Sequence, residues 1–352
     1  MLRLSSMGCA LRASWLSSLL GFSVLACGGT SGSGSSSSSS PTTTKAPDGT
    51  EVLSSLKILT PSEGGQAVYS PIIKGIKPGD DLTYCSYSGV YTQEEQFVHF
   101  IQGSQTKYGH HAIMFYTTKA EEPRTELCTG QSMETLTQLI GGVGGEGVVN
   151  FSGLPENSGT IIPKGAQFVI QTHWINTGDE VAEGQAMMAT VPGPATNRVV
   201  LGTMAVVNLT FNVPALSPGA ATMDCPLEHD TQVLLTLGHE HEWGTHVRAD
   251  AIRASSGQDD VLFDRDFTPH DVFAPPVDTY TMDKPLELSK GDKIKLDCQW
   301  QNTTSDALTF PREMCVFFSF SLTPGDAQCV NGAWIYSGNS PYVGDGGAPP
   351  AN

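Results

Sequence analysis

The chain has 352 residues and a formal net charge of −17, from 36 acidic and 19 basic side chains. Such a charge repels nucleic acid and anionic lipid surfaces, so we expect neither as a partner. Its 38 glycines and 22 prolines interrupt short apolar runs, and no long stretch repeats with the period of a helix. This pattern favours an all-β protein.

Residues 1–27 have the composition of an export signal, with Arg3 and Arg12 ahead of an apolar run that is too short to span a membrane comfortably. The run ends at Cys27 in the sequence Val-Leu-Ala-Cys, which resembles a bacterial lipobox and implies lipidation of that thiol after cleavage. The Gly/Ser-rich residues 28–50 are expected to form a flexible tether. We therefore expect an extracytoplasmic lipoprotein, anchored to a bacterial outer membrane or cell surface through Cys27.

Three histidines on predicted strands of the first half of the remaining chain are candidate metal ligands. We expect strands at residues 51–61, 67–73, 81–87, 96–101, 108–116 and 165–176. His110 and His111 are adjacent, so on an ideal strand they point to opposite faces. Both can reach one metal only where the chain bends, which Gly109 permits. His173 falls on the inward face of its strand.

Two segments rich in glycine or proline are expected to be irregular. Residues 141–149 predict a loop, which is no phosphate cradle because it lacks the Gly-Lys-Ser/Thr motif. Pro192-Gly-Pro-Ala marks a domain junction. The roughly 300 residues after the tether exceed one ordinary domain. We expect two tandem antiparallel β-sandwiches at residues 51–195 and 196–337, then a flexible tail at 338–352; one large β domain is the alternative.

A predicted strand in the second half, residues 232–253, has an apolar face that leads into two histidines. Its odd positions are apolar or histidine, whereas its even positions are mostly polar: Val233, Leu235, Leu237, His239 and His241 share one face. Residues two apart on a strand point the same way, so the two imidazoles would leave the buried face together. Burying such a pair is costly unless something specific holds it, and a bound metal would do so.

Three other interpretations of this segment fit less well. A helical zinc-protease motif needs H-E-x-x-H, whereas His241 and His246 are one residue too far apart and Gly244 disfavours a helix. A blue-copper site needs a free Cys as well as a Met, and we expect Cys315, which follows Met314, to be in a disulfide. Accidental histidines at a solvated strand end conflict with the apolar face. His246 is on the polar face and is expected at the surface.

Met314 is the sixth ligand candidate. Its predicted strand, residues 309–320, places it on an apolar face, where methionine is usually core filling. With the five histidines, however, it completes one set of three imidazoles and one set of two imidazoles and a thioether. Thioethers favour Cu(I), imidazoles suit both copper oxidation states, and a zinc site has no use for methionine. The other histidines, His99, His229 and His270, are expected to be structural.

Eight cysteines are present, and removing Cys9 of the signal segment and Cys27 leaves six. An even number in an exported protein predicts disulfides, whose connectivity the spacing leaves open. The six are Cys85, Cys128, Cys225, Cys298, Cys315 and Cys329. Since two precede residue 200 and four follow it, the simplest partition is one bridge in the first domain and two in the second. Residues 199–211 and 292–300 are further expected strands, the latter with Ile294, Leu296, Cys298 and Trp300 inward.

In their order and spacing, these residues resemble the copper type II, ascorbate-dependent monooxygenases, the family of peptidylglycine α-hydroxylating monooxygenase and dopamine β-monooxygenase. Five ordered motifs, between about residues 50 and 335, carry the resemblance: Tyr84-Cys85, Gly109-His110-His111, Gln171-Thr172-His173-Trp174, His239-Glu240-His241 and Glu313-Met314-Cys315.

The resemblance implies two copper ions, one in each sandwich, with a solvent-filled cleft between them. The electron-transfer copper would be held by His110, His111 and His173. The catalytic copper, where O2 and substrate meet, would be held by His239, His241 and Met314. Ascorbate or another one-electron donor would reduce both metals. The family pattern also pairs Cys85 with Cys128, Cys225 with Cys329 and Cys298 with Cys315.

Departures from the family concern the substrate. The peptide-amidating member holds its substrate carboxylate with an Arg, an Asn and a Tyr at positions that are Leu237, Val316 and Phe318 here. The cysteine that follows the His-His pair in animal members is also absent, since residues 115–119 contain none. The apolar replacements make a peptidylglycine substrate doubtful and point to a less charged one.

We therefore expect a copper-dependent monooxygenase that uses O2 and a reductant such as ascorbate to hydroxylate a C–H bond of a small organic substrate. The alternative is a non-catalytic surface lipoprotein that binds and stores copper. A third possibility, an adhesive β-sandwich with relic ligands, conflicts with retention of all six ligand types.

Overall fold

The computed structural model describes residues 43–129, 132, 138–150, 154–272 and 275–336. The predicted signal segment with Cys27, most of the tether and the tail lie outside these residues. Residues Pro41–Asn352 form one compact unit. We call residues 43–200 its first half and 201–336 its second half. The described residues contain no helix of the length and apolar character needed to cross a membrane.

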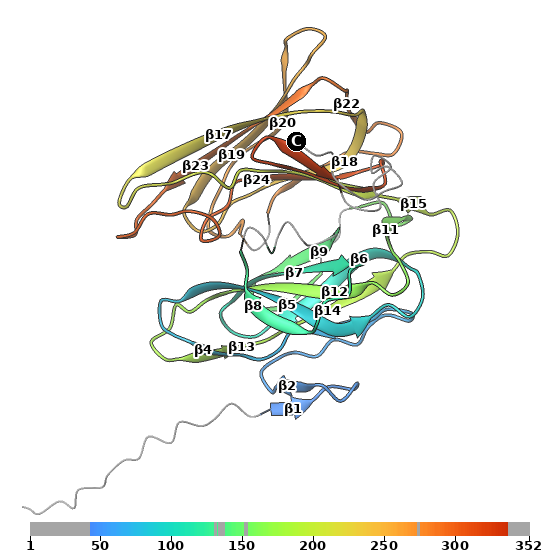
Figure 1. The fold of residues 1–352 in the computed structure, drawn as a ribbon, viewed down its shortest axis with the longest axis vertical. Helices are drawn as coiled ribbons and strands as arrows, with labels where there is room; N and C mark the ends of the chain where they lie inside the picture. The colour runs from blue at the N-terminus through green and yellow to red at the C-terminus, as the bar shows by residue number, and fades with distance from the viewer. Residues whose placement is uncertain (1–42, 130–131, 133–137, 151–153, 273–274, 337–352) are drawn as a thin grey trace, which may run out of the picture. The chain divides into compact units, whose positions relative to one another are not determined.

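The fold is all-β, as the composition predicts, and its strands form several sheets (Figure 1). One sheet of the first half has the order β15 (Val199–Val200), β11 (Ser158–Ile162), β6 (Gln96–Gln105), β14 (Ala186–Pro192) and β3 (Ala67–Tyr69), with β10 (Gly147–Asn150) also paired to β6. The other has the order β8 (Arg124–Leu127), β5 (Asp81–Tyr91), β12 (Gln167–Ile175), β7 (Gly109–Thr117) and β9 (Gln138–Gly144). Two short pairs are β1 (Thr43–Lys45) with β2 (Glu51–Leu53), and β4 (Ile73–Ile76) with β13 (Ala182–Gly184).

The second half contributes a larger and a smaller sheet. The larger has the order β21 (Val277–Thr279), β18 (Thr231–His239), β24 (Val316–Ser321), β16 (Gly202–Val207), β25 (Gly325–Val330) and β26 (Ala333–Tyr336), with β22 (Leu286–Leu288) also paired to β18. The smaller has the order β17 (Pro218–Pro226), β23 (Lys293–Gln301), β19 (Gly244–Ile252) and β20 (Asp259–Asp266). Pairing is antiparallel except for β11 with β15 and β16 with β25.

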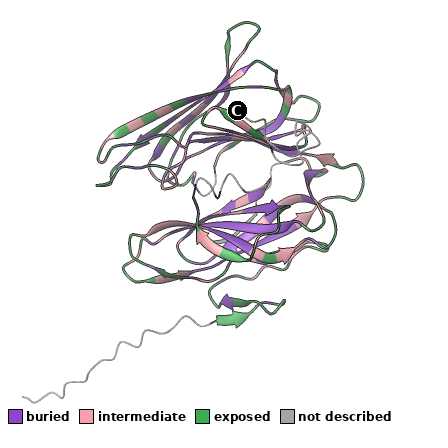
Figure 2. Cartoon of the chain, viewed as in Figure 1, coloured by how far each residue is buried: buried purple, intermediate pink, exposed green. Residues whose placement is uncertain are grey.

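Each half has its own large apolar cluster, one drawn from residues 68–188 and the other from residues 204–329. The central strands β7 and β12 are buried along almost their whole length, which is visible as purple ribbon in Figure 2. Strand β23 alternates as predicted, with Ile294, Leu296, Cys298 and Trp300 buried between more exposed polar residues. Strands covered on both sides lose the polar alternation that strands with one wet face keep.

The three disulfides join Cys85 to Cys128, Cys225 to Cys329 and Cys298 to Cys315, which confirms the pairing that the resemblance implies. The last bridge ties β23 to the residue that follows Met314.

Several sequence-based expectations differ from the structure. Much of the expected loop at 141–149 is in strands β9 and β10, because glycines let neighbouring strands approach closely; a Cβ on Gly141 would lie 3.0 Å from Ile101 Cγ1. Residues 43–45 of the expected tether pair with β2. The expected strand 309–320 begins only at Val316, so Met314 precedes it.

A further difference concerns residues 232–253, which form two strands with a turn between them. Strand β18 ends at His239 and β19 begins at Gly244, so His241 lies in the connection rather than on a strand. Period-two alternation ends with the strand, and Glu240, expected on a polar face, is fully buried. At the expected junction, β15 still pairs with β11 of the first half, so the chain leaves that sheet only after Val200.

The bend that two adjacent histidine ligands require is present at the start of β7. Opposite β12, His173 pairs with His111 and Trp174 pairs with Gly109, so His110 is an extra residue that bulges out of register. Gly109 permits this because it has no Cβ. A Cβ at this position would lie only 2.6 Å from Gln105 Cβ.

We predict that Gly109→Ala destabilises the protein by about 1–3 kcal/mol, the usual effect of overpacking. Gln105 cannot move aside freely, because its Nε2 donates a hydrogen bond to the Gly145 carbonyl at 2.9 Å. Urea unfolding measures the change. Gly89→Ala on β5 is the matched control, since its nearest neighbour would be 3.9 Å away, and it should be neutral or stabilising. Equal effects of both substitutions would contradict the role given to Gly109.

Candidate metal centre

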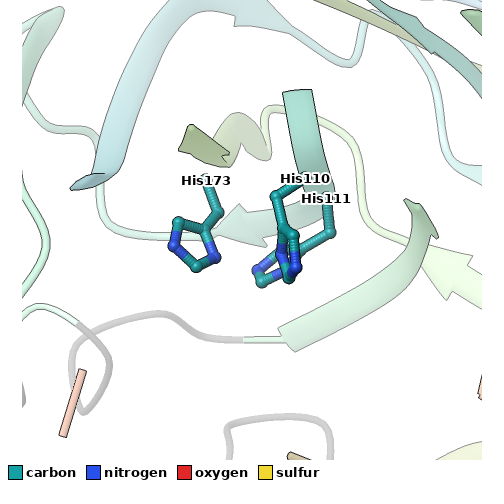
Figure 3. A group of neighbouring side chains, drawn as sticks. All are labelled: His110, His111 and His173. Atoms are coloured by element: carbon teal, nitrogen blue, oxygen red, sulfur yellow. The ribbon is translucent and has the colours of Figure 1, made fainter. Parts of the chain in front are cut away.

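Three histidines of the first half lie together on the β7–β12 pair. The bulge at His110 and the direct pairing of His111 with His173 bring the three imidazoles to one place (Figure 3). One ring nitrogen from each lies within 4.8 Å of the other two. All three residues are almost completely buried. The first predicted ligand set is therefore assembled in space.

The two histidines of the second half join this group. One ring nitrogen each of His111, His239 and His241 also lies within 4.8 Å of the other two, so His111 belongs to both groups. The ring centres of His173 and His241 are 4.8 Å apart, and those of His111 and His241 are 5.5 Å apart. Five histidines from both halves thus converge on one place.

This convergence differs from the solvent-filled cleft that the resemblance implies between the two ligand sets. Adjacent imidazoles of the two sets are in ring contact, and His173 and His241 are at most 1% exposed. Uncharged rings can pack against one another in this way, whereas charged imidazolium rings would repel.

In two of these imidazoles, one ring nitrogen is hydrogen-bonded and the other has no hydrogen-bond partner among the described residues. His173 Nε2 lies 2.6 Å from Asp81 Oδ1, and His241 Nδ1 lies 3.0 Å from the carbonyl oxygen of Arg312. Because a carboxylate and a carbonyl oxygen only accept, these two nitrogens donate. The opposite nitrogens, His173 Nδ1 and His241 Nε2, are buried and have no hydrogen-bond partner among the described residues. A neutral imidazole held in this way presents a lone pair suited to a metal.

His110 links the two halves through a carboxylate. Its Nε2 lies 3.0 Å from Glu242 Oε1, and its Nδ1 lies 3.2 Å from His111 Nδ1. Although burial acts in the opposite direction, the interaction with His110 lowers the pKa of Glu242. The carboxylate therefore stays ionised and faces the imidazole from outside the histidine group.

The cluster disfavours protonation of its imidazoles. Burial, followed by repulsion from neighbouring imidazoles, lowers the pKa of His111 and His241 well below 6.5 and that of His239 to about 3. Burial also lowers the pKa of His110, against the opposing effect of Glu242. These histidines are therefore uncharged in the metal-free protein, which is the form that binds metals.

Glu313 connects Met314 to this cluster. Its Oε2 accepts hydrogen bonds from the backbone N–H of His241 at 2.9 Å, from that of Met314 at 3.1 Å and from the indole Nε1 of Trp300 at 3.0 Å. Its Oε1 accepts from the N–H of Trp243 at 2.9 Å. Burial raises the pKa of Glu313 to about 7, although the three amides act to lower it. One buried carboxyl group thus fixes Met314 relative to His241.

Glu240 is the second buried carboxyl group, and sequence alternation placed it at the surface. Neither of its side-chain oxygens has a hydrogen-bond partner among the described residues. Burial, and then repulsion from Glu313, raise the pKa of Glu240 well above its usual value; nearby backbone amides offset this only in part. Burial without hydrogen-bond partners therefore favours the uncharged form of this carboxyl group.

The remaining histidines with described contacts lie outside the cluster. His246 is flanked by Asp264 and Asp266, each at 3.0 Å, and His99 Nδ1 lies 2.7 Å from the carbonyl oxygen of Ser158. Sequence reasoning missed Asp81 and the backbone of Arg312. A signal for Asp81 exists, since it opens the strand that carries Cys85, next to the strand of His173.

No protein-family model matches the chain, and no curated protein matches it. Among solved structures, it is similar to the major capsid protein P2 from bacteriophage PM2, with 9% identity, 73% of this chain and 97% of that chain covered, and a TM-score of 0.30. It is also similar to an archaeal virus protein described as a triple jelly roll, with 10% identity, 74% and 59% covered, and a TM-score of 0.22. Scores this low support no inference about fold or function.

We predict that His241→Gln flattens the pH dependence of stability of the metal-free protein below pH 6.5. The unfolded chain takes up a proton at this histidine near pH 6.5, while the folded chain resists it, so folding loses stability as the pH falls. The slope of the unfolding free energy against pH should therefore decrease in the variant by the equivalent of up to about one proton. Urea unfolding of chelator-treated protein between pH 7.5 and about 5 measures this.

The raised pKa values of Glu240 and Glu313 have the opposite effect, because they favour folding as the pH falls. Both residues are present in the parent and in His241→Gln, so their effect cancels in the comparison. His270→Gln is the control, because its side chain is 81% exposed. An unchanged slope in His241→Gln, or the same change in His270→Gln, would contradict the buried neutral imidazole.

Proposed function

We propose that the chain is a copper-dependent monooxygenase that uses O2 and a reductant such as ascorbate to hydroxylate a small organic substrate. The observation that carries the proposal is the convergence of five histidines, two of which, His173 and His241, have a buried nitrogen with no hydrogen-bond partner among the described residues. The segment that holds Met314 is tied to this group through Glu313. The proposal includes two tandem β-sandwiches, in line with the separate apolar clusters of the two halves. It also includes two copper ions, held by His110, His111 and His173, and by His239, His241 and Met314.

The donor chemistry supports copper rather than zinc. The proposed ligands are imidazoles and one thioether, and they include no thiolate because all six cysteines of the described residues are in disulfides. Thioether donors favour Cu(I), and imidazoles serve both oxidation states. Copper would supply one-electron redox chemistry and the activation of O2.

The chain's own residues prepare the site for that chemistry. Asp81 and the carbonyl of Arg312 orient His173 and His241, while Glu313 sets the backbone of His241 relative to Met314. Burial keeps His110, His111 and His241 uncharged and excludes bulk water. In the proposed reaction one oxygen atom enters a substrate C–H bond, and the other leaves as water with two electrons from the reductant and two protons.

The surroundings favour an uncharged substrate. Leu237 and Phe318 are paired across β18 and β24 and belong to one apolar cluster, and Val316 pairs with His239. The resemblance places an Arg, a Tyr and an Asn of the peptide-amidating enzyme at Leu237, Phe318 and Val316. A carboxylate buried here would have no cationic partner at these positions, which is costly. We therefore propose a small apolar substrate rather than a peptidylglycine.

The alternative, a copper-storage lipoprotein, draws support from the close packing of the histidines. Imidazoles in ring contact and almost fully buried suit tight retention of a metal as well as catalysis. For either function, the three disulfides are consistent with an oxidising compartment outside the cytoplasm. Anchoring through lipidated Cys27 is part of the proposal.

We predict that the copper-loaded chain holds two coppers and consumes O2 with ascorbate in a substrate-dependent way. Met314→Leu should lower product formation by a factor of at least about 100, because losing a ligand exceeds the 10–100-fold typical of outer-shell changes. Oxygen uptake and product analysis with a panel of small apolar compounds measure this. Met223→Leu, in the apolar cluster of the second half, is the matched control.

Tight copper binding without product from any compound, in parent and variant alike, would favour storage. Zinc, or fewer than two metals per chain, in metal analysis of the purified protein would contradict the two-copper proposal.

A further inference from the structure

Asp81 and Arg312 come from distant parts of the chain and meet beside the histidine cluster. Asp81 opens β5 in the first half, and Arg312 precedes Glu313 in the second. Arg312 Nε lies 3.7 Å from Asp81 Oδ2. Both atoms are buried and have no hydrogen-bond partner among the described residues. For these two atoms, the other member of the pair is therefore the nearest compensating charge.

Each member of this pair also holds one of the histidines that retain a free buried nitrogen. Asp81 uses its other oxygen, Oδ1, to bind His173 Nε2, while the backbone carbonyl of Arg312 binds His241 Nδ1. The contacts form one continuous path from His173 through Asp81 and Arg312 to His241. The path begins in one ligand set and ends in the other.

The local surroundings leave the pair little freedom. The Arg312 guanidinium lies 5.0 Å from the centre of the Trp243 ring, and Trp243 is itself held by Glu313. On another side of the cluster, Glu242 of the second half faces His110 of the first. The second half thus offers a cation to Asp81 and an anion to His110, so charge complementarity favours one relative placement of the two histidine sets.

We propose that Asp81 and Arg312 are positioning residues that couple the two metal-ligand sets, so that the geometry of each set depends on the other. The Arg312 side chain fixes the Asp81 carboxylate, which fixes the ring plane of His173. In return, Asp81 restrains the segment whose carbonyl orients His241. This inference rests on the proposed function, since it concerns residues that would hold copper.

The test compares Asp81→Asn, Arg312→Gln and the double variant in the full chain. Arg312→Gln removes the cation but keeps the backbone carbonyl that holds His241. Cu(II) is titrated into metal-free protein in competition with a chelator, and its electron paramagnetic resonance spectrum is recorded at each step. Each single variant should weaken copper binding roughly 10–100-fold and alter the spectrum. The double variant should bind copper no more weakly than the weaker-binding single variant. Either substitution alone already interrupts the path from His173 to His241.

Two further variants separate coupling from a general loss of stability. Arg312→Lys keeps the positive charge and should recover most of the copper affinity. Arg265→Gln removes an arginine from an exposed pair with Asp278, at 2.6 Å, and should leave copper binding unchanged. Urea unfolding of each metal-free variant identifies any that fail to fold; in that event Arg312→Lys against Arg312→Gln decides the question.

Additive losses in the double variant, or unchanged copper binding in Arg312→Gln, would overturn the coupling while leaving the proposed function in place. A parent protein that binds no copper would overturn both.

Discussion

The candidate site depends on two buried imidazoles that each donate a hydrogen bond from one ring nitrogen to a fixed oxygen atom. His173 is held by Asp81, and His241 is held by the carbonyl of Arg312. Because the donating nitrogens face these oxygens, the opposite nitrogens remain buried and unpartnered. A proton is a poor occupant, since burial and neighbouring imidazoles lower the pKa of His241. A metal ion is the partner that this arrangement suits.

Features governed by local chemistry could be predicted from the sequence. The alternation of β23 gave the buried residues correctly, because one side of that strand faces the apolar cluster and the other is polar. The bend at Gly109 followed from the need to bring adjacent histidines together. The disulfide pairing came from the family resemblance, not from spacing, which left the connectivity open. All-β class, finally, is a property of the composition as a whole.

Features governed by contacts between distant segments could not be predicted. Arg312 carries no motif, and its contact with Asp81 exists only where β5 and the segment before β24 meet. Glu240 was misplaced because alternation was extended past His239, where the strand ends and the chain turns. The ring contacts among five histidines replace the expected wet gap, since no pattern in the sequence states how closely the two ligand sets approach.

In the proposed function, the unpartnered nitrogens His173 Nδ1 and His241 Nε2 are copper ligands. Anomalous X-ray scattering from crystals of the copper-loaded protein, collected on both sides of the copper absorption edge, tests it most directly. We expect copper peaks at bonding distance from His173 Nδ1 and His241 Nε2, with the Met314 sulfur facing the peak at His241. Copper bound only at surface carboxylates, with these two nitrogens bonded to protein groups instead, would contradict it.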